Sequence, residues 1–269
     1  MFGLFKRNKE VAAPARYPVF DDMQAYNDRR HARQIIRREY IAPGLESNAL
    51  FENMLNQNHL LIAGMPGSGK SVIANALIFE GLKRTPKECK FVLIDPKRVE
   101  LCMYKRLPHV MAYASDIDDI VNALQDVADL MDERYNSMAN TSKRKYAGAH
   151  IYIVIDELAD LMLTAKKRVE PVLLHLLQLG RAARIHVVMC TQCPLSTIIS
   201  TPIKCCCDAR VGLHTRNARD SRNIIDMPGC ENLPRYGKAF YITPESTKTV
   251  NVPMVTDDQI NDMIEYWTR

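Results

Sequence analysis

One short segment constrains this chain more than any other feature of the sequence. It fits the pattern G-x-x-x-x-G-K-[ST] at every position and lies between an apolar run and a helical stretch. In such a loop the glycines let backbone N–H groups surround phosphates, and the helix N-terminus adds its positive end. We therefore predict an ATP site, with Lys70 at the β and γ oxygens and Ser71 holding Mg²⁺. The nucleotide-binding candidates are Gly64, Gly67, Ser68, Gly69, Lys70 and Ser71.

A pair of acids follows the apolar run 151–155. A phosphate-binding loop needs a carboxylate at the end of a neighbouring strand, and Asp156 is placed to position Mg²⁺ through its water shell. Glu157 is placed to polarise an attacking water as a general base. The alternative is that two acids simply end a strand. The adjacent pair favours hydrolysis of ATP over transfer of phosphate to a second substrate.

A polar pair, Thr191-Gln192, ends the next apolar run, 186–190. We predict that the side chain of Gln192 hydrogen-bonds the γ-phosphate or the attacking water, because motor ATPases place a polar sensor at this strand end.

The spacing of apolar runs predicts an α/β fold, a mostly parallel sheet with helices on both faces. The simplest partition is one domain over 45–269, preceded by a basic N-terminal tail and helix over 1–44. The charge run at 21–40 is either a solvated helix face or an arm for phosphate or a partner. The predicted strands are 60–63, 91–94, 151–155, 186–190, 209–213 and 239–242, and the predicted helices are 71–84, 116–139 and 169–183.

Composition narrows the class of protein. A chain of 269 residues that is 47% hydrophobic and 25% charged is long and apolar enough to bury a full core, which excludes intrinsic disorder and fibres. No apolar run reaches the length of a membrane span, and charge follows the first five residues too soon for a signal peptide, so we expect a soluble, cytoplasmic protein. The net charge of +5 permits anionic partners such as nucleic acid.

The eight cysteines are expected to be reduced in such a compartment. Cys190 and Cys193 form a CxxC pair, which in principle suits a metal or redox site if residues 205–207 supply further thiolates. The simpler interpretation is that Cys190 is a small buried side chain at the end of a strand.

Several further motifs, taken in chain order, resemble the FtsK/SpoIIIE family of DNA-translocating motors over about residue 48 to the C-terminus. The resemblance implies a RecA-like P-loop NTPase core that assembles as a hexameric ring around double-stranded DNA, with Arg181 as the arginine finger of the neighbouring ATP site. The motifs are Ile94-Asp95-Pro96-Lys97, Met131-Asp132-Glu133-Arg134-Tyr135, Asp156-Glu157-Leu158-Ala159-Asp160-Leu161-Met162, Gly180-Arg181-Ala182-Ala183-Arg184-Ile185-His186, Thr191-Gln192 and Asp220-Ser221-Arg222.

The positions that contact DNA in the family are only partly retained. Lys204 and Arg222 match channel cations, whereas Cys193 stands where the family usually has an arginine and Ala218 replaces another cation. Four arginines nevertheless lie between residues 210 and 222, and such cations bind phosphates with little sequence preference. The alternative is a solvated basic loop. The DNA-binding candidates are Lys204, Arg216, Arg219 and Arg222.

The sequence as a whole favours an ATP-driven translocase of double-stranded DNA. Its lack of the membrane spans and C-terminal winged helix of full-length family members favours a phage, plasmid or other mobile element, with a loading partner at the N-terminal extension. The alternatives are a secretion-type or packaging-type ATPase of the FtsK/HerA kind, acting on a protein or a viral genome, and a small-molecule kinase or nucleotide-gated scaffold.

Overall fold

A mixed sheet of eight strands organises the chain in the computed structural model, which describes residues 45–252 and 254–268. The strand order is β3-β2-β4-β5-β1-β6-β7-β8. The six strands from β3 to β6 are parallel, and β7 and β8 extend the sheet antiparallel. The strands are β1 His59–Ala63, β2 Cys89–Ile94, β3 Val110–Ala114, β4 His150–Ile155, β5 Ile185–Thr191, β6 Ala209–Gly212, β7 Lys238–Ile242 and β8 Thr247–Asn251.

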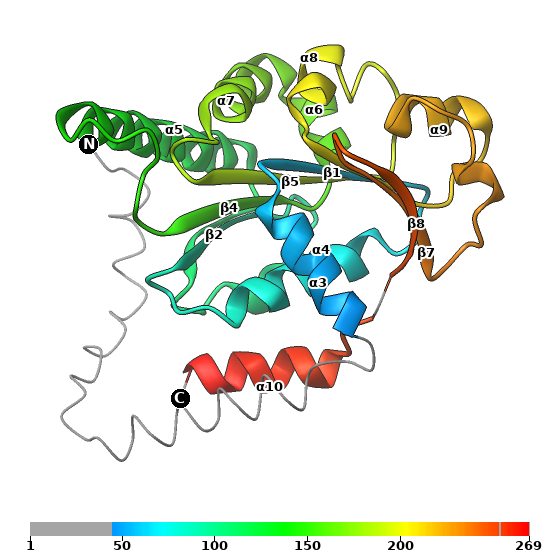
Figure 1. The fold of residues 1–269 in the computed structure, drawn as a ribbon, viewed down its shortest axis with the longest axis horizontal. Coiled ribbons are helices and arrows are strands. Elements are labelled where there is room, and N and C mark those ends of the chain that lie inside the picture. The colour runs from blue at the N-terminus through cyan, green and yellow to red at the C-terminus, as the bar shows by residue number, and fades with distance from the viewer. Residues whose placement is uncertain (1–44, 253, 269) are drawn as a thin grey trace.

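Helices cover both faces of the sheet and leave two hydrophobic cores, one on each side (Figure 1). Helices α5, α6, α7 and α8 lie over one face, and α3, α4 and α10 lie over the other, while α9 packs beside β6. The helices are α3 Leu45–Asn56, α4 Lys70–Leu82, α5 Ile117–Asn140, α6 Leu158–Thr164, α7 Lys166–Leu179, α8 Thr201–Cys206, α9 Ala218–Ile225 and α10 Asp257–Thr268.

The central strands are buried because both of their faces meet helices. Every residue of β1 and β5 is buried, as parallel strands in this position require. Parallel pairing brings the carboxyl ends of these strands to one edge of the sheet, where ligands bind in open α/β folds. Thr191, Ile155 and Ala63, the last residues of β5, β4 and β1, therefore lie along the same edge.

The predicted fold class and the six predicted strands are confirmed, as are the helices predicted over 71–84 and 116–139, each to within two residues. The helix predicted over 169–183 is wrong at both ends, because α7 begins at Lys166 and stops at Leu179. Gly180 then packs tightly, since a Cβ there would lie 2.6 Å from the carbonyl oxygens of Leu176 and Ile185. The chain turns before β5 begins.

Two strands, β3 and β8, were not predicted because they lie at the two edges of the sheet. β3 is only partly buried, and β8 is exposed over most of its length, so neither needs a continuous apolar run. The helices α3, α6, α8, α9 and α10 were also missed. The helix predicted over 21–40 lies outside the described residues. None of the described helices is both long and apolar enough to cross a membrane.

Candidate nucleotide site

The loop at residues 64–69 is fastened between the ends of two strands. The N–H of Gly64 donates to the carbonyl of Thr191 at the end of β5 (3.4 Å), and the N–H of Met65 donates to the carbonyl of His214 just beyond β6 (2.9 Å). A Cβ on Gly64 would lie 2.7 Å from both the Leu213 Cβ and the Ser68 Oγ, so this position accepts only glycine. The loop is thus held against the carboxyl edge of the sheet.

Two glycines give the loop its curvature. Gly67 and Gly69 have φ angles of +75° and +104°, which side chains other than glycine rarely adopt. Helix α4 starts directly afterwards, so the N–H groups of its first turn have no acceptor within the helix and point out of its N-terminus. The hydroxyl of Ser68 is buried without a hydrogen-bond partner among the described residues. These orphaned donors fit a bound phosphate chain.

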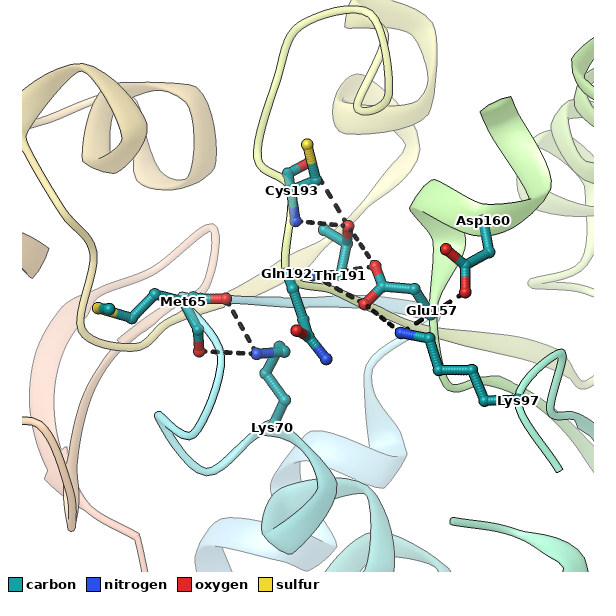
Figure 2. A network of polar contacts seen from close by, with 9 residues as sticks. Met65, Lys70, Lys97, Glu157, Asp160, Thr191, Gln192 and Cys193 are labelled. Atoms are coloured by element: carbon teal, nitrogen blue, oxygen red, sulfur yellow. Dashed lines mark hydrogen bonds and ion pairs between the residues drawn. The ribbon is translucent and has the colours of Figure 1, made fainter. Parts of the chain in front are cut away.

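Lys70 is folded back onto its own loop. Its Nζ donates to the carbonyls of Gly64 and Met65, both at 2.9 Å, and the side chain is buried (Figure 2). Burial lowers the pKa of this amine. The two carbonyl partners are neutral, so they leave the positive charge of the ammonium group uncompensated. The β and γ oxygens of ATP would replace these carbonyls as its partners.

Glu157 is buried where β4 and β5 end side by side. Its Oε1 accepts hydrogen bonds from the Thr191 hydroxyl (2.9 Å) and from the backbone N–H of Gln192 (3.0 Å). The Thr191 hydroxyl in turn accepts from the N–H of Cys193 (3.2 Å). The side chain of Gln192 is exposed and extends toward the side of the site where Lys70 lies (Figure 2). Gln192 therefore meets Glu157 through its backbone.

A lysine from the loop after β2 also reaches this carboxylate. The Nζ of Lys97 lies 3.6 Å from Oε2 of Glu157 and 3.5 Å from Oδ2 of Asp160 (Figure 2). Half of the Lys97 side chain is exposed, so it bridges the buried acid and solvent. Glu157 is thus held on two sides, by Thr191 within the sheet and by Lys97 at its rim.

Asp156 lies one residue before Glu157, and its N–H donates to the carbonyl of Ile94 at the end of β2 (3.0 Å). Burial raises the pKa of its carboxyl group to about 6, and the nearby charges of Glu100, Asp95 and Glu157 raise it further. A divalent cation relieves both effects, because it pairs with the ionised carboxylate. Asp156 and the Ser71 hydroxyl, at the start of α4, are the residues that would hold Mg²⁺.

Arg181 lies at the opposite edge of the sheet. It is exposed, in the turn between α7 and the first residue of β5, whereas Glu157 contacts the last residue of β5. The length of β5 separates them by about 20 Å, at roughly 3.3 Å per residue. An arginine side chain does not span this distance, so Arg181 cannot reach the nucleotide site of its own chain.

The predicted DNA-binding cations divide into two groups. Lys204, at the end of α8, is ion-paired with Asp226 (2.5 Å), which also pairs with Arg210. Arg216, Arg219 and Arg222 are exposed, in α9 and the loop before it, and none of the three has an ion pair with another described residue. Lys204 and Arg210 therefore share one carboxylate, which offsets part of their charge within the chain.

Sequence reasoning missed the role of Thr191 and Lys97 around Glu157. Thr191 ends β5 and Lys97 follows β2, and both meet Glu157 because β5 and β2 are the two neighbours of β4 in the sheet. The interpretation of Cys190 as a buried strand residue is confirmed. The cysteines described are all free, and the described residues contain no cluster of three or more metal-binding side chains.

A mostly parallel sheet with this loop between strand and helix defines a P-loop nucleotide-binding protein. The model of the FtsK/SpoIIIE family matches residues 22–153 and 148–196. Over 98% of its length the chain is 32% identical to the DNA translocase SpoIIIE of Bacillus subtilis (strain 168). The chain therefore belongs to the FtsK/SpoIIIE family. It covers 36% of the length of that relative.

Two solved structures have the same fold at 21% sequence identity. The conjugation coupling protein TcpA of pCW3, solved as a monomer with ATPγS, superposes with a TM-score of 0.71 over 79% of this chain and 65% of TcpA. The cytoplasmic domain of the type VII secretion ATPase EccC of Thermomonospora curvata gives 0.63 over 74% of this chain and 26% of EccC.

Proposed function

We propose that this protein is an ATP-hydrolysing motor that moves double-stranded DNA. The observation that carries the hydrolytic part is the buried Glu157, fixed at the end of β5 beside the P-loop. In this proposal its carboxylate takes a proton from the attacking water, and the second acid after Asp156 favours water over a bound substrate as the phosphate acceptor. Family membership and the translocase relative support the DNA part.

The residues of the site have separate roles in this proposal. Lys70 and the loop N–H groups bind the β- and γ-phosphates, and Ser71 and Asp156 hold Mg²⁺, which neutralises charge that develops on the phosphates. Gln192 turns its amide toward the γ-phosphate or the attacking water. Glu157 accepts the proton of that water.

Glu157 must leave part of its present network before it acts. Its Oε1 accepts two hydrogen bonds and its Oε2 faces the Lys97 ammonium, so both oxygens already have partners that an attacking water would have to replace. A movement at the end of β5 or in the loop that carries Lys97 would free the carboxylate. ATP hydrolysis would then depend on the conformation of the strand ends.

Arg181 completes the site of a neighbouring subunit. A finger at the edge opposite the P-loop serves a ring in which each subunit faces the next head to tail, and the family resemblance favours a hexamer. The planar guanidinium then stabilises charge on the neighbour's γ-phosphate. This arrangement makes hydrolysis a property of the assembly.

Duplex DNA lies in the ring channel against Arg216, Arg219 and Arg222, and Lys204 joins them once it leaves Asp226. The contacts are with backbone phosphates, so binding is nearly independent of sequence. We propose a cytoplasmic motor that serves a plasmid or other mobile element, with a loading partner at residues 1–44. The structural likeness to the conjugation coupling protein TcpA supports this setting.

A secretion-type motor acting on protein is the second candidate, because the fold is shared with the secretion ATPase EccC. The deciding experiment measures ATP hydrolysis by the purified protein with and without long duplex DNA, at low and moderate salt, with Lys70→Ala as the inactive control. Stimulation by duplex DNA supports the translocase. Unchanged hydrolysis at both salt concentrations would contradict it and favour a protein substrate.

A further inference from the structure

A pocket opens at the edge of the sheet opposite the P-loop. It lies where β2 and β4 begin side by side, since Cys89 and His150, the first residues of these strands, are register partners. Its volume is about 340 Å³. The residues that line it are Arg84, Lys87, Glu88, Ala147, Gly148, His150 and Arg184.

Three of these residues are cations, and none of the three forms an ion pair within the part of the chain that the structure describes. Arg84 donates to the hydroxyl of Tyr152 (3.2 Å), and Arg184 donates to the carbonyl of Gly148 (3.0 Å). Neutral partners thus fix the two guanidinium groups without cancelling their charge. Lys204 and Arg210 differ in this respect, because both pair with Asp226.

The acidic residue of the lining is turned toward the backbone. The Oε2 of Glu88 accepts hydrogen bonds from the N–H (2.8 Å) and the hydroxyl (2.7 Å) of Thr85. This carboxylate closes the turn between α4 and β2, and its neutral partners leave its charge in place, so the lining holds three cations and one anion. The pocket therefore keeps an excess of positive charge.

His150, the first residue of β4, also lines the pocket. Its Nδ1 lies 2.9 Å from Nε2 of His186, in a stack of rings at the start of β4 and β5. Burial lowers the pKa of His150 to about 4, and the charges of His186, Arg184 and Arg84 lower it further. The imidazole of His150 is therefore neutral near pH 7 and adds no charge to the lining.

The loop before the pocket extends the cationic surface. Lys143, Arg144 and Lys145 are exposed and shortly precede Ala147 and Gly148 in the lining. The loop is anchored, because the N–H of the next residue, Tyr146, donates to the carbonyl of Ala182 (2.9 Å). Its cations are thereby held beside the turn that carries Arg184.

We propose that this pocket binds a phosphate group. Arginine presents paired donors that match phosphate oxygens, and two fixed guanidinium groups with a lysine at the mouth give the donors that a phosphate needs. The phosphate belongs either to a nucleic-acid backbone or to a free phosphate compound. The site is separate from the P-loop and from the cations of α9, and it does not rest on the proposed motor function.

Lys87→Glu tests the proposal, because Lys87 is exposed and the change should not disturb the fold. The matched control is Lys105→Glu, an exposed lysine in the loop between β2 and β3 that does not line the pocket. Arg84→Gln is the second variant. Two probes are used: pyrophosphate, followed by calorimetry with the P-loop saturated by ADP, and a short mixed-sequence duplex, followed by fluorescence anisotropy over a range of salt.

We expect Lys87→Glu to weaken one probe about tenfold, with a smaller loss for Arg84→Gln and little change for Lys105→Glu. Loss confined to pyrophosphate identifies a free phosphate ligand. Loss of duplex affinity with a flatter salt dependence identifies backbone phosphate. Equal behaviour of Lys87→Glu and Lys105→Glu with both probes would overturn the proposal. The pyrophosphate result does not depend on DNA-stimulated hydrolysis, so the two proposals can fail separately.

Discussion

The proposed functional side chains of this protein fall into a buried set and an exposed set. Lys70, Asp156 and Glu157 are buried at the carboxyl edge of the sheet, and each has contacts that fix it within one chain. Arg181 and the arginines of α9 are exposed, without ion pairs to described residues. The positions of the buried side chains are therefore set by contacts within a single subunit. The exposed set gains a role only from something outside the chain.

This difference predicts two kinds of phenotype. Changes in the buried set should alter nucleotide chemistry or stability in any assembly state, because their partners are internal. Changes in the exposed set should be silent until a neighbouring subunit or DNA is present.

Arg181→Ala should slow ATP hydrolysis by about 10³-fold, the lower end for supplied arginine fingers, while nucleotide affinity stays nearly unchanged. This loss should appear only in the assembled protein, because Arg181 acts on the ATP site of a neighbouring subunit. Hydrolysis per subunit of wild type should rise with protein concentration as the subunits assemble, whereas the residual hydrolysis of Arg181→Ala should stay low. Wild-type hydrolysis per subunit that is the same before and after assembly would place Arg181 outside any shared site.

Glu157→Gln should slow hydrolysis by about 10²- to 10³-fold and leave ATP bound, since an amide cannot take a proton from water. Lys70→Ala should abolish binding of ATP, because the charge at the β and γ oxygens is lost. Filter binding and hydrolysis assays separate the two variants. If Glu157→Gln lost ATP and Lys70→Ala retained it, the assigned roles would be wrong.

Asp156→Asn should stabilise the protein in the absence of nucleotide and Mg²⁺. The folded-state pKa of about 6 exceeds the ordinary 3.8, so the fold prefers the protonated acid, and stability is lost as the pH rises through 6. We expect a gain in the free energy of unfolding of about 1–2 kcal/mol near pH 7.5, allowing for solvent screening, and almost none near pH 4. Urea unfolding at both pH values measures it.

The control for Asp156→Asn is the same measurement with Mg²⁺ and a non-hydrolysable ATP analogue. Wild type should then gain more stability than the variant, because only the carboxylate pairs with the ion. An equal gain in both proteins would remove Asp156 from the metal site.

Asp226→Asn should raise DNA affinity a few-fold and steepen its salt dependence, because Lys204 and Arg210 are released from their carboxylate. Asparagine tolerates the positive φ of 62° at this position, so the fold should lose about 1 kcal/mol or less. Arg222→Ala is the opposing variant and should flatten the salt slope by about one unit. Identical slopes for all three proteins would place DNA elsewhere.

The sequence predicts the buried set well because its chemistry is local. The spacing within residues 64–71 and the acids that directly follow a strand place Lys70 and Glu157 without any knowledge of the packing. The contacts of Glu157 with Thr191 and Lys97 are long-range, since they depend on which strands are neighbours in the sheet. Strand order is set by the packing of the whole domain, and no local pattern records it.

The contacts of the exposed set are even harder to predict from the sequence, because they too depend on long-range packing. A count of basic residues groups Lys204 with Arg222, but the structure pairs Lys204 with an acid 22 residues further along the chain. The pocket cations Arg84 and Arg184 are likewise brought together only by adjacent strands, β2 and β4, and by the turn before β5. Basic residues that are close in sequence therefore need not all be free to bind a phosphate in the folded protein.

Complementation between two inactive variants tests the central claim most directly, that the ATP site is shared between the buried set of one subunit and Arg181 of the next. Lys70→Ala retains its finger and Arg181→Ala retains its P-loop. Each alone should hydrolyse almost no ATP, and mixing them in equal amounts should restore a substantial fraction of wild-type hydrolysis, because some interfaces then carry both intact parts. A mixture as inactive as its components, in a protein shown to assemble, would contradict the account.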